Sequence, residues 1–314
     1  MGKRLIKAAR ILIGLAVVAI LFRSLSDIGW ANLLNEMPTT PWFYVIVVVM
    51  YFLLPVFETA IYGTLIPVPV RKLSLLSVFI RKKVLNLDLM GYSGELFFLI
   101  WVKDKLGLAR GKMLRIMVDV GITSSMGAFA ATGLLLGLLL VTGQIQLTQL
   151  VGDNDLYLFY GTIIVVAVVV TVGHRFRHTL FKLPGTTIMG LFGVHLSRFL
   201  IIYILQILQW WVVLPDIPFY VWGTMLAIQT VTNRLPFLMT RDLVAMSVIL
   251  GIPGILEGAD TAIAAMLLTR SVADRIISVG MFVPLSLASG SKSARTDQIG
   301  SEDVGVEPAQ EEDA

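Results

Sequence analysis

Apolar runs long enough to cross a lipid bilayer recur along this chain and constrain its fold more than any other feature. A helix needs ~20 mostly apolar residues to cross the ~30 Å hydrocarbon core. Such runs lie at about 5–22, 42–65, 117–141, 156–172, 188–214 and 259–285, and Pro55 inside the second predicts a kink. Hydrophobic residues make up 56% and charged residues 15% of the 314-residue chain, which is too apolar for a soluble domain. The sequence therefore predicts an all-α polytopic membrane protein with about six full transmembrane helices.

Polar residues and glycines interrupt a further pair of apolar segments, at about 73–102 and 219–250. In the first segment the polar positions fall between residues 81 and 95, and in the second between residues 233 and 242. A lipid-facing helix would not carry them. Non-helical backbone survives at membrane depth only where protein or a water-filled cavity satisfies its peptide groups. We therefore expect each segment to form a re-entrant helical hairpin.

Lysine and arginine are distributed very unevenly between the loops, and this distribution predicts the topology. Basic residues crowd the N-terminus and the stretches 71–83, 103–115 and 175–182, whereas 27–41, 143–155, 215–218 and 252–259 contain none. The basic set is expected to face the cytoplasm. Basic and non-basic loops fall on consistent sides of the membrane only if both interrupted segments are re-entrant hairpins that enter from opposite sides. This gives an inverted-repeat-like architecture with both termini cytoplasmic. We expect an integral protein of the cytoplasmic (inner) membrane.

The predicted domain organisation is simple. Residues 1–285 form one integral membrane domain, and residues 286–314, rich in glycine, serine and acidic residues, form a disordered cytoplasmic tail. The chain has no cysteine, so structural disulfides and thiolate chemistry are excluded. It contains neither the HExxH nor the GxSxG pattern, and we expect a non-enzymatic protein without cofactor, metal or nucleic-acid partner.

Charged residues inside the apolar segments are the candidates for a substrate site, because a charge at mid-membrane costs at least ~2.5–3.5 kcal/mol on insertion scales. The candidates are Arg241, Asp242, Arg270, Arg198, Glu95 and Asp119. Arg198 and Arg270 each lie about ten residues into a predicted span, which reaches about mid-membrane. Arg241 lies at the expected tip of the second hairpin. Guanidinium groups facing one cavity would suit a phosphate.

A structural explanation stands beside the functional one for each candidate. Arg241 can hold its hairpin through an ion pair with a nearby carboxylate. Arg198 can pair with Glu58 or Asp119 of a neighbouring span. Glu95 can gate an entrance, bind a cationic headgroup or take protons, but it can also sit in the first turn of a helix, where the helix dipole favours a carboxylate. Asp119 has the same functional options, and helix capping explains it almost as well.

Several short motifs resemble those of a known family. Gly91-Tyr92-Ser93-Gly94-Glu95, followed by an apolar helix and then Asp119 at the start of a span, resembles the first motif region of the flippase-like transmembrane domain of lysylphosphatidylglycerol synthases and their stand-alone relatives. The stretch 236–242 and Arg270 resemble the second, although residues 237–239 replace the usual glycines. The resemblance implies a lipid-translocating domain in which Arg241, Asp242 and Arg270 belong to the site.

The predicted function is the flipping or scrambling of a lipid or lipid-linked anionic headgroup across the membrane. Its partner is then a membrane phospholipid or a polyprenyl-phosphate lipid. The alternative is a non-catalytic membrane subunit that supports a glycosyltransferase or lipid-modifying enzyme. In that case the acidic tail and the basic loops would be docking surfaces for a membrane enzyme partner.

Overall fold

The computed structural model describes residues 34–66, 71–88, 93–143, 181–232, 241–250 and 259–302. Every regular element in these ranges is an α-helix. The predicted spans at 5–22 and 156–172 lie outside the described residues, as do residues 89–92 and 233–240 of the two interrupted segments. The all-α prediction is confirmed for the part of the chain that the structure describes.

Among the described residues, three helices are long and apolar enough to cross a membrane: α3 (Pro41–Leu65), α6 (Arg110–Val141) and α10 (Gly185–Trp211). They correspond to the predicted spans at 42–65, 117–141 and 188–214. With 25, 32 and 27 residues, each exceeds the length of the hydrocarbon core. Their outer faces carry exposed apolar side chains, among them Val48, Leu134 and Ile204, which suits contact with lipid. The chain is therefore consistent with an integral membrane protein.

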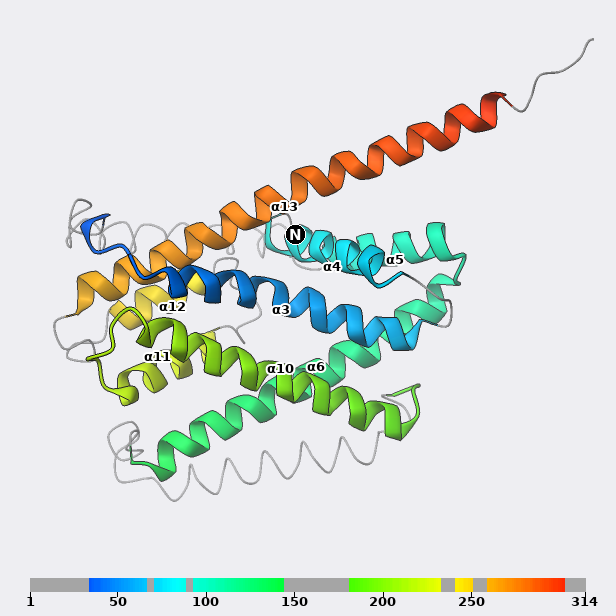
Figure 1. The fold of residues 1–314 in the computed structure, drawn as a ribbon. Helices are drawn as coiled ribbons and strands as arrows, with labels where there is room; N and C mark the ends of the chain where they lie inside the picture. The colour runs from blue at the N-terminus through cyan, green and yellow to red at the C-terminus, as the bar shows by residue number, and fades with distance from the viewer. Residues whose placement is uncertain are drawn as a thin grey trace, which may run out of the picture.

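Helix α10 packs against both α6 and α3, and α6 crosses α10 (Figure 1). Gly127 allows the close approach of α6 to α10. A Cβ atom at Gly127 would lie 2.9 Å from the Cβ of His195 and 3.0 Å from the backbone nitrogen of Leu196. These distances are shorter than ordinary van der Waals contacts, so glycine is needed where the two helices cross.

The first interrupted segment forms a pair of helices, α4 (Lys72–Asp88) and α5 (Ser93–Leu106), which pack on each other. Helix α4 also packs on α3. The aromatic rings of Tyr62, Phe79 and Phe98 meet here, with centroids 4.8–5.2 Å apart. The predicted helix pair is present, and its re-entrant insertion stays a prediction.

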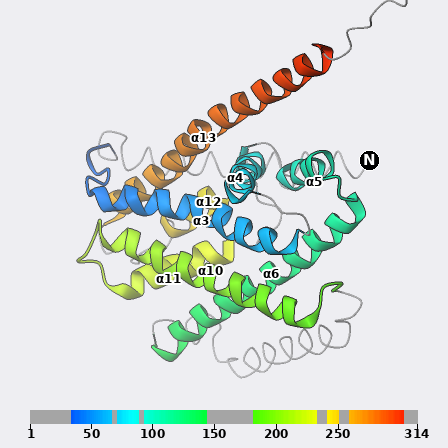
Figure 2. The same cartoon turned by 45° about the vertical axis from the view of Figure 1, so that its right-hand side comes forward.

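The second interrupted segment forms α11 (Phe219–Thr232) and α12 (Arg241–Leu250), which also pack on each other. Helix α13 (Asp260–Glu302) then runs past α12, α3 and α4 and extends away from the other helices (Figures 1 and 2). It continues past residue 285, where the span was predicted to end, as far as Glu302. The disordered tail stays a prediction.

Two apolar cores lie toward opposite ends of α3. One includes Phe43 and Val47 with residues of α6, α10, α11, α12 and α13. The other includes Ile61 and Tyr62 with residues of α4, α5 and α6. The stretch of α3 from Met50 to Glu58 separates the two cores. Lys82, Lys83 and Arg270 each contact a residue of this stretch.

Candidate functional site

A cavity of about 280 Å³ lies where α3, α4, α10, α11, α12 and α13 meet. Its polar lining consists of Lys83, Tyr203, Gln206, Gln229, Thr230, Arg270, Ser271 and Asp274. Apolar side chains such as Met50, Leu54 and Met246 complete the wall. The volume can hold on the order of ten water molecules, or a small polar headgroup. Both interrupted segments contribute to this polar cavity, together with the apolar helices α3 and α10.

Arg270 of α13 is held in place by partners from α13 itself, α10 and α3. Its Nε donates to Oδ2 of Asp274, one turn further along α13, over 2.9 Å. Its Nη1 donates over 2.9 Å to Oε1 of Gln209, which also accepts a hydrogen bond from Nε2 of Gln206. The same Nη1 lies 3.3 Å from the sulfur of Met50. A guanidinium group fixed in this way presents a defined geometry to an anion.

Lys83 of α4 reaches the cavity by bonding to the backbone of α3. Its Nζ donates to the carbonyl oxygen of Tyr51 over 2.6 Å and lies 3.6 Å from the centroid of the Tyr51 ring. In a regular helix this carbonyl would accept the N–H of residue 55, but Pro55 has none. Pro55, which was expected to kink the span, therefore does not donate to the carbonyl oxygen of Tyr51, and this oxygen accepts the ammonium group of Lys83. An ammonium group has three N–H donors, so Lys83 retains donors for a ligand.

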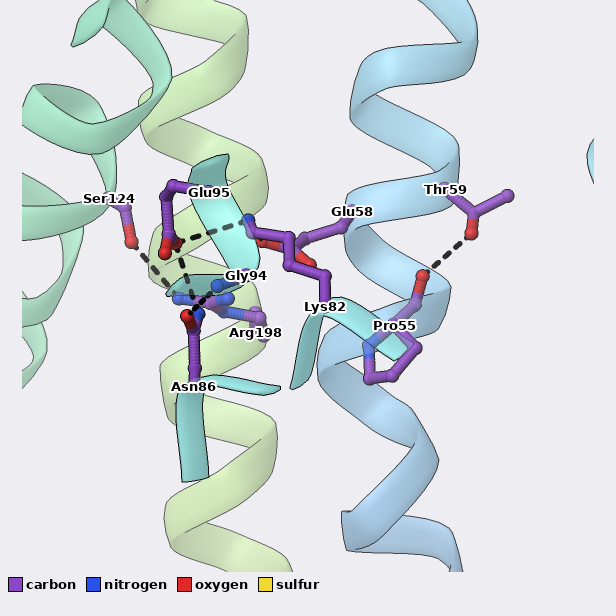
Figure 3. A network of polar contacts seen from close by, with 9 residues as sticks. All are labelled: Pro55, Glu58, Thr59, Lys82, Asn86, Gly94, Glu95, Ser124 and Arg198. Carbon is purple, nitrogen blue, oxygen red and sulfur yellow. Dashed lines mark hydrogen bonds and ion pairs between the residues drawn. The ribbon is translucent and has the colours of Figure 1, made fainter. Parts of the chain in front are cut away.

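A second group of charges lies between α3, α4, α5 and α10 (Figure 3). We call Glu58, Lys82, Glu95 and Arg198 the four-charge cluster. Lys82 Nζ lies 2.5 Å from Oε1 of Glu58 and 3.5 Å from Oε1 of Glu95. Arg198 donates from Nη2 to the hydroxyl of Ser124 over 3.1 Å. Lys82 and Arg198 are only 5% and 6% exposed, so these charges are internal to the helix packing.

The junction between α4 and α5 sets the position of Glu95. Asn86 accepts the backbone N–H of Gly94 over 2.7 Å and donates to Oε1 of Glu95 over 3.2 Å. Ser93 donates to the carbonyl of Leu85 over 2.6 Å. A Cβ atom at Gly94 would overlap the carbonyl oxygen of Lys82. The start of α5 therefore closes tightly on α4, and the expectation that Glu95 occupies a first helical turn is confirmed.

The candidates predicted from sequence fall in different places. Arg270 lines the polar cavity, whereas Arg198 and Glu95 lie in the four-charge cluster. Asp119 is 1% exposed, and its Oδ2 accepts the backbone N–H groups of Lys182 and Leu183 over 3.0 and 2.8 Å. It therefore ties α6 to the segment before α10. Arg241 and Asp242 begin α12, but their side chains lie outside the described residues. Arg198 and Arg270 thus belong to separate groups of residues rather than to the one shared cavity that we expected.

The residues that sequence reasoning missed are Lys83, Gln206, Gln209 and Gln229. Lys83 had been assigned to the cytoplasmic basic stretch at 71–83, yet it bonds to the middle of α3. Gln206 and Gln209 are one helical turn apart in a predicted membrane span, and this spacing was a usable signal.

No family model, curated protein or solved structure matches this chain. The resemblance to the flippase-like transmembrane domain therefore stays a prediction from residues 91–95, Asp119, 236–242 and Arg270.

Proposed function

We propose that this protein binds the anionic headgroup of a lipid or lipid-linked compound in the polar cavity and moves it across the membrane. The observation that carries the proposal is the convergence of Lys83 and Arg270 on one polar cavity between apolar helices. Counting Asp274, the lining carries one net positive charge, which suits a phosphodiester. The amide groups of Gln206 and Gln229 add neutral donors and acceptors for the rest of the headgroup.

The location of the cavity supports a translocating role. Its wall includes Met50 and Tyr203, in the interior of helices long enough to span the bilayer. A headgroup bound there would sit away from either membrane surface while its acyl chains remain in lipid. Both interrupted segments border the cavity, so movement of one helix pair against the other would open it to alternate sides. The proposal includes six full spans, two opposed re-entrant hairpins and cytoplasmic termini in the inner membrane.

Liposomes containing the purified protein and a fluorescent phosphatidylglycerol test this proposal, with a membrane-impermeant quencher reporting which leaflet holds the lipid. The wild-type protein should move the lipid faster than protein-free liposomes do. A Lys83→Gln, Arg270→Gln double variant should fall to the protein-free rate. The matched control is Lys72→Gln with Arg110→Gln, which removes the same charges from exposed positions outside the cavity.

Wild-type activity in the double variant would refute the cavity as the site. A fluorescent lipid with a neutral sugar headgroup distinguishes anion recognition from general scrambling, because only the anionic lipid should depend on Lys83 and Arg270. The alternative function, a non-catalytic subunit of a lipid-modifying or glycosyltransferase complex, predicts no lipid movement by the purified protein and stable co-purification with an enzyme.

A further inference from the structure

The lining of the polar cavity contains neutral hydrogen-bonding groups that the protein itself does not pair. Three such side chains make no hydrogen bond in the described part of the chain: Gln229, Thr230 and Ser271. Together they offer two hydroxyl groups and one amide, each of which can both donate and accept. Buried polar groups without a protein partner are expected to bind water or a ligand.

Thr230 shows this most clearly because it lies inside a helix and is only 5% exposed. A threonine in a helix commonly donates from its hydroxyl to the carbonyl oxygen four residues earlier. Thr224 of the same helix does so, with 2.9 Å to the carbonyl oxygen of Tyr220. Thr230 makes no such bond among the described residues, and it lines the cavity. Its hydroxyl is therefore available to a guest in the cavity.

The cations and the neutral groups of the lining come from different helix pairs. Lys83 belongs to α4 and Arg270 to α13, and these two helices pack on each other. Gln229 and Thr230 belong to α11, which packs on α10, the helix that contributes Gln206. The cavity therefore has a cationic side, from α4 and α13, and a neutral hydrogen-bonding side, from α10 and α11.

The cationic side keeps donors for an anion. Arg270 uses Nε and Nη1 within the protein, and its Nη2 makes no hydrogen bond in the described part of the chain. Lys83 uses one donor on the carbonyl oxygen of Tyr51 and has two more. These N–H groups suit the oxygen atoms of one phosphate. The volume of about 280 Å³ leaves room for more than a phosphate.

Three common kinds of headgroup match this lining poorly. A fully ionised phosphate monoester only accepts hydrogen bonds and offers no donor to Oε1 of Gln229. Lys83 and Arg270 would repel an amine, and the carboxylate of Asp274 is already paired with Arg270. A choline group lacks N–H and O–H donors and is recognised by aromatic cages, whereas Tyr203 is the one aromatic residue in the described lining.

We propose that the headgroup bound in the polar cavity is a phosphodiester that carries a neutral polyol, either glycerol or a sugar. This assignment rests on the proposed function and narrows its substrate. The phosphate accepts from Lys83 and from Nη2 of Arg270. The hydroxyl groups of the polyol bond to Gln229, Thr230 and Ser271, so each unpaired group of the lining gains a partner. A glycerophospholipid and a lipid-linked sugar phosphodiester both supply this chemistry.

Binding of short-chain lipids to the detergent-solubilised protein tests the headgroup without any transport. One series comprises dioctanoyl phosphatidylglycerol, phosphatidic acid, phosphatidylethanolamine and phosphatidylcholine, which differ only in the headgroup. A second series compares a short prenyl phosphate with the same compound carrying a sugar on its phosphate. The change in thermal unfolding with ligand concentration gives each Kd. In at least one series the polyol-bearing lipid should bind ~10-fold or more tightly than every other member.

The two series also distinguish the sources of the headgroup. Preference for phosphatidylglycerol assigns a glycerophospholipid, and preference for the glycosylated prenyl phosphate assigns a lipid-linked sugar. Equal affinities within both series would overturn the proposal. So would tighter binding of an amine, choline or bare phosphate headgroup than of the polyol-bearing lipids.

Substitutions on the neutral side of the cavity show whether the polyol is recognised there. Thr230→Val keeps the shape of the side chain and removes its hydroxyl, and Gln229→Leu removes the amide. Each should weaken binding of the preferred polyol lipid by roughly 3- to 10-fold and leave binding of phosphatidic acid unchanged. The matched control is Thr224→Val, in the same helix but outside the cavity lining, which should bind both lipids as the wild type does.

Thermal unfolding without lipid establishes that each variant is folded. Unchanged binding of the polyol lipid in both Thr230→Val and Gln229→Leu would contradict the assignment, as would an equal loss in Thr224→Val.

The headgroup assignment and the translocating function fail separately. Binding without preference for a polyol, together with lipid movement that depends on Lys83 and Arg270, leaves the translocating function intact and refutes the polyol headgroup. Preference for a polyol lipid without any lipid movement in liposomes does the reverse: it retains a binding site for a polyol phosphodiester and refutes translocation.

Discussion

Replacing Pro55 by alanine would restore a backbone N–H at the position where α3 lacks one. That N–H would donate to the carbonyl oxygen of Tyr51, which now accepts the ammonium of Lys83 over 2.6 Å. A hydrogen bond to a charged group contributes ~1.5–3 kcal/mol to stability. The new helical hydrogen bond would compete with the lysine for the same oxygen. Lys83 should therefore matter less to stability once Pro55 is gone.

A double-mutant cycle measures this dependence. Lys83→Met should destabilise the otherwise wild-type protein by ~1.5–3 kcal/mol. The same change in the Pro55→Ala background should cost less by at least ~1 kcal/mol, because the backbone then supplies a donor. Equilibrium unfolding of the detergent-solubilised protein gives each free energy.

The control cycle pairs Pro55→Ala with Lys72→Met, an exposed lysine at the start of α4. These two changes should be additive within ~0.5 kcal/mol. If Pro55→Ala and Lys83→Met are equally additive, the link between the missing N–H and the position of Lys83 is wrong.

Three further results are expected. Gly94→Ala should destabilise the protein by ~1–3 kcal/mol, because the new Cβ atom overlaps the carbonyl oxygen of Lys82. The control Gly121→Ala lies in an open part of α6 and should be neutral or stabilising by up to ~1 kcal/mol. Thermal unfolding compares the two variants. Asp119→Ala should cost ~3 kcal/mol or more in the same assay, because it removes two charge-assisted hydrogen bonds at a buried site. Single cysteines at Ser93 and Thr240 should react with an impermeant thiol reagent from the cytoplasmic and the outer side respectively; labelling from the reverse sides, or from neither, would contradict opposed hairpins.

The apolar helices could be predicted from sequence because length and hydropathy suffice for them. Helices α3, α6 and α10 begin and end within a few residues of the predicted spans, apart from the earlier start of α6. The paired helices of the interrupted segments were also visible, because glycine and clustered polar residues mark the break. The first-turn position of Glu95 followed from the glycines before it.

The partners of the charged residues could not be predicted in the same way. Counting basic residues assigns Lys82 and Lys83 to the cytoplasmic surface, since the rule on topology considers number and not pairing. Their true partners lie on α3, more than twenty residues away in the chain. In the sequence, Glu58 was the residue that could have indicated these ion pairs, because an isolated carboxylate in an apolar helix requires a counter-charge. The separation of Arg198 from Arg270 depends on helix packing, which single-sequence patterns do not contain.

Successive residues of an α-helix project ~100° apart around its axis. Because of this angle, Lys82 points into the four-charge cluster and Lys83 into the polar cavity, although the two residues are chemically identical. Rotating α4 by a single position would place one of the two lysines in the environment that the other now has, and would move that other lysine out of both environments. Variation in the residues before α4 is therefore constrained less by their own sequence than by the need to place this helix at one rotation about its axis. A one-residue insertion there is the smallest change in length that could separate a lysine from its partners through such a rotation.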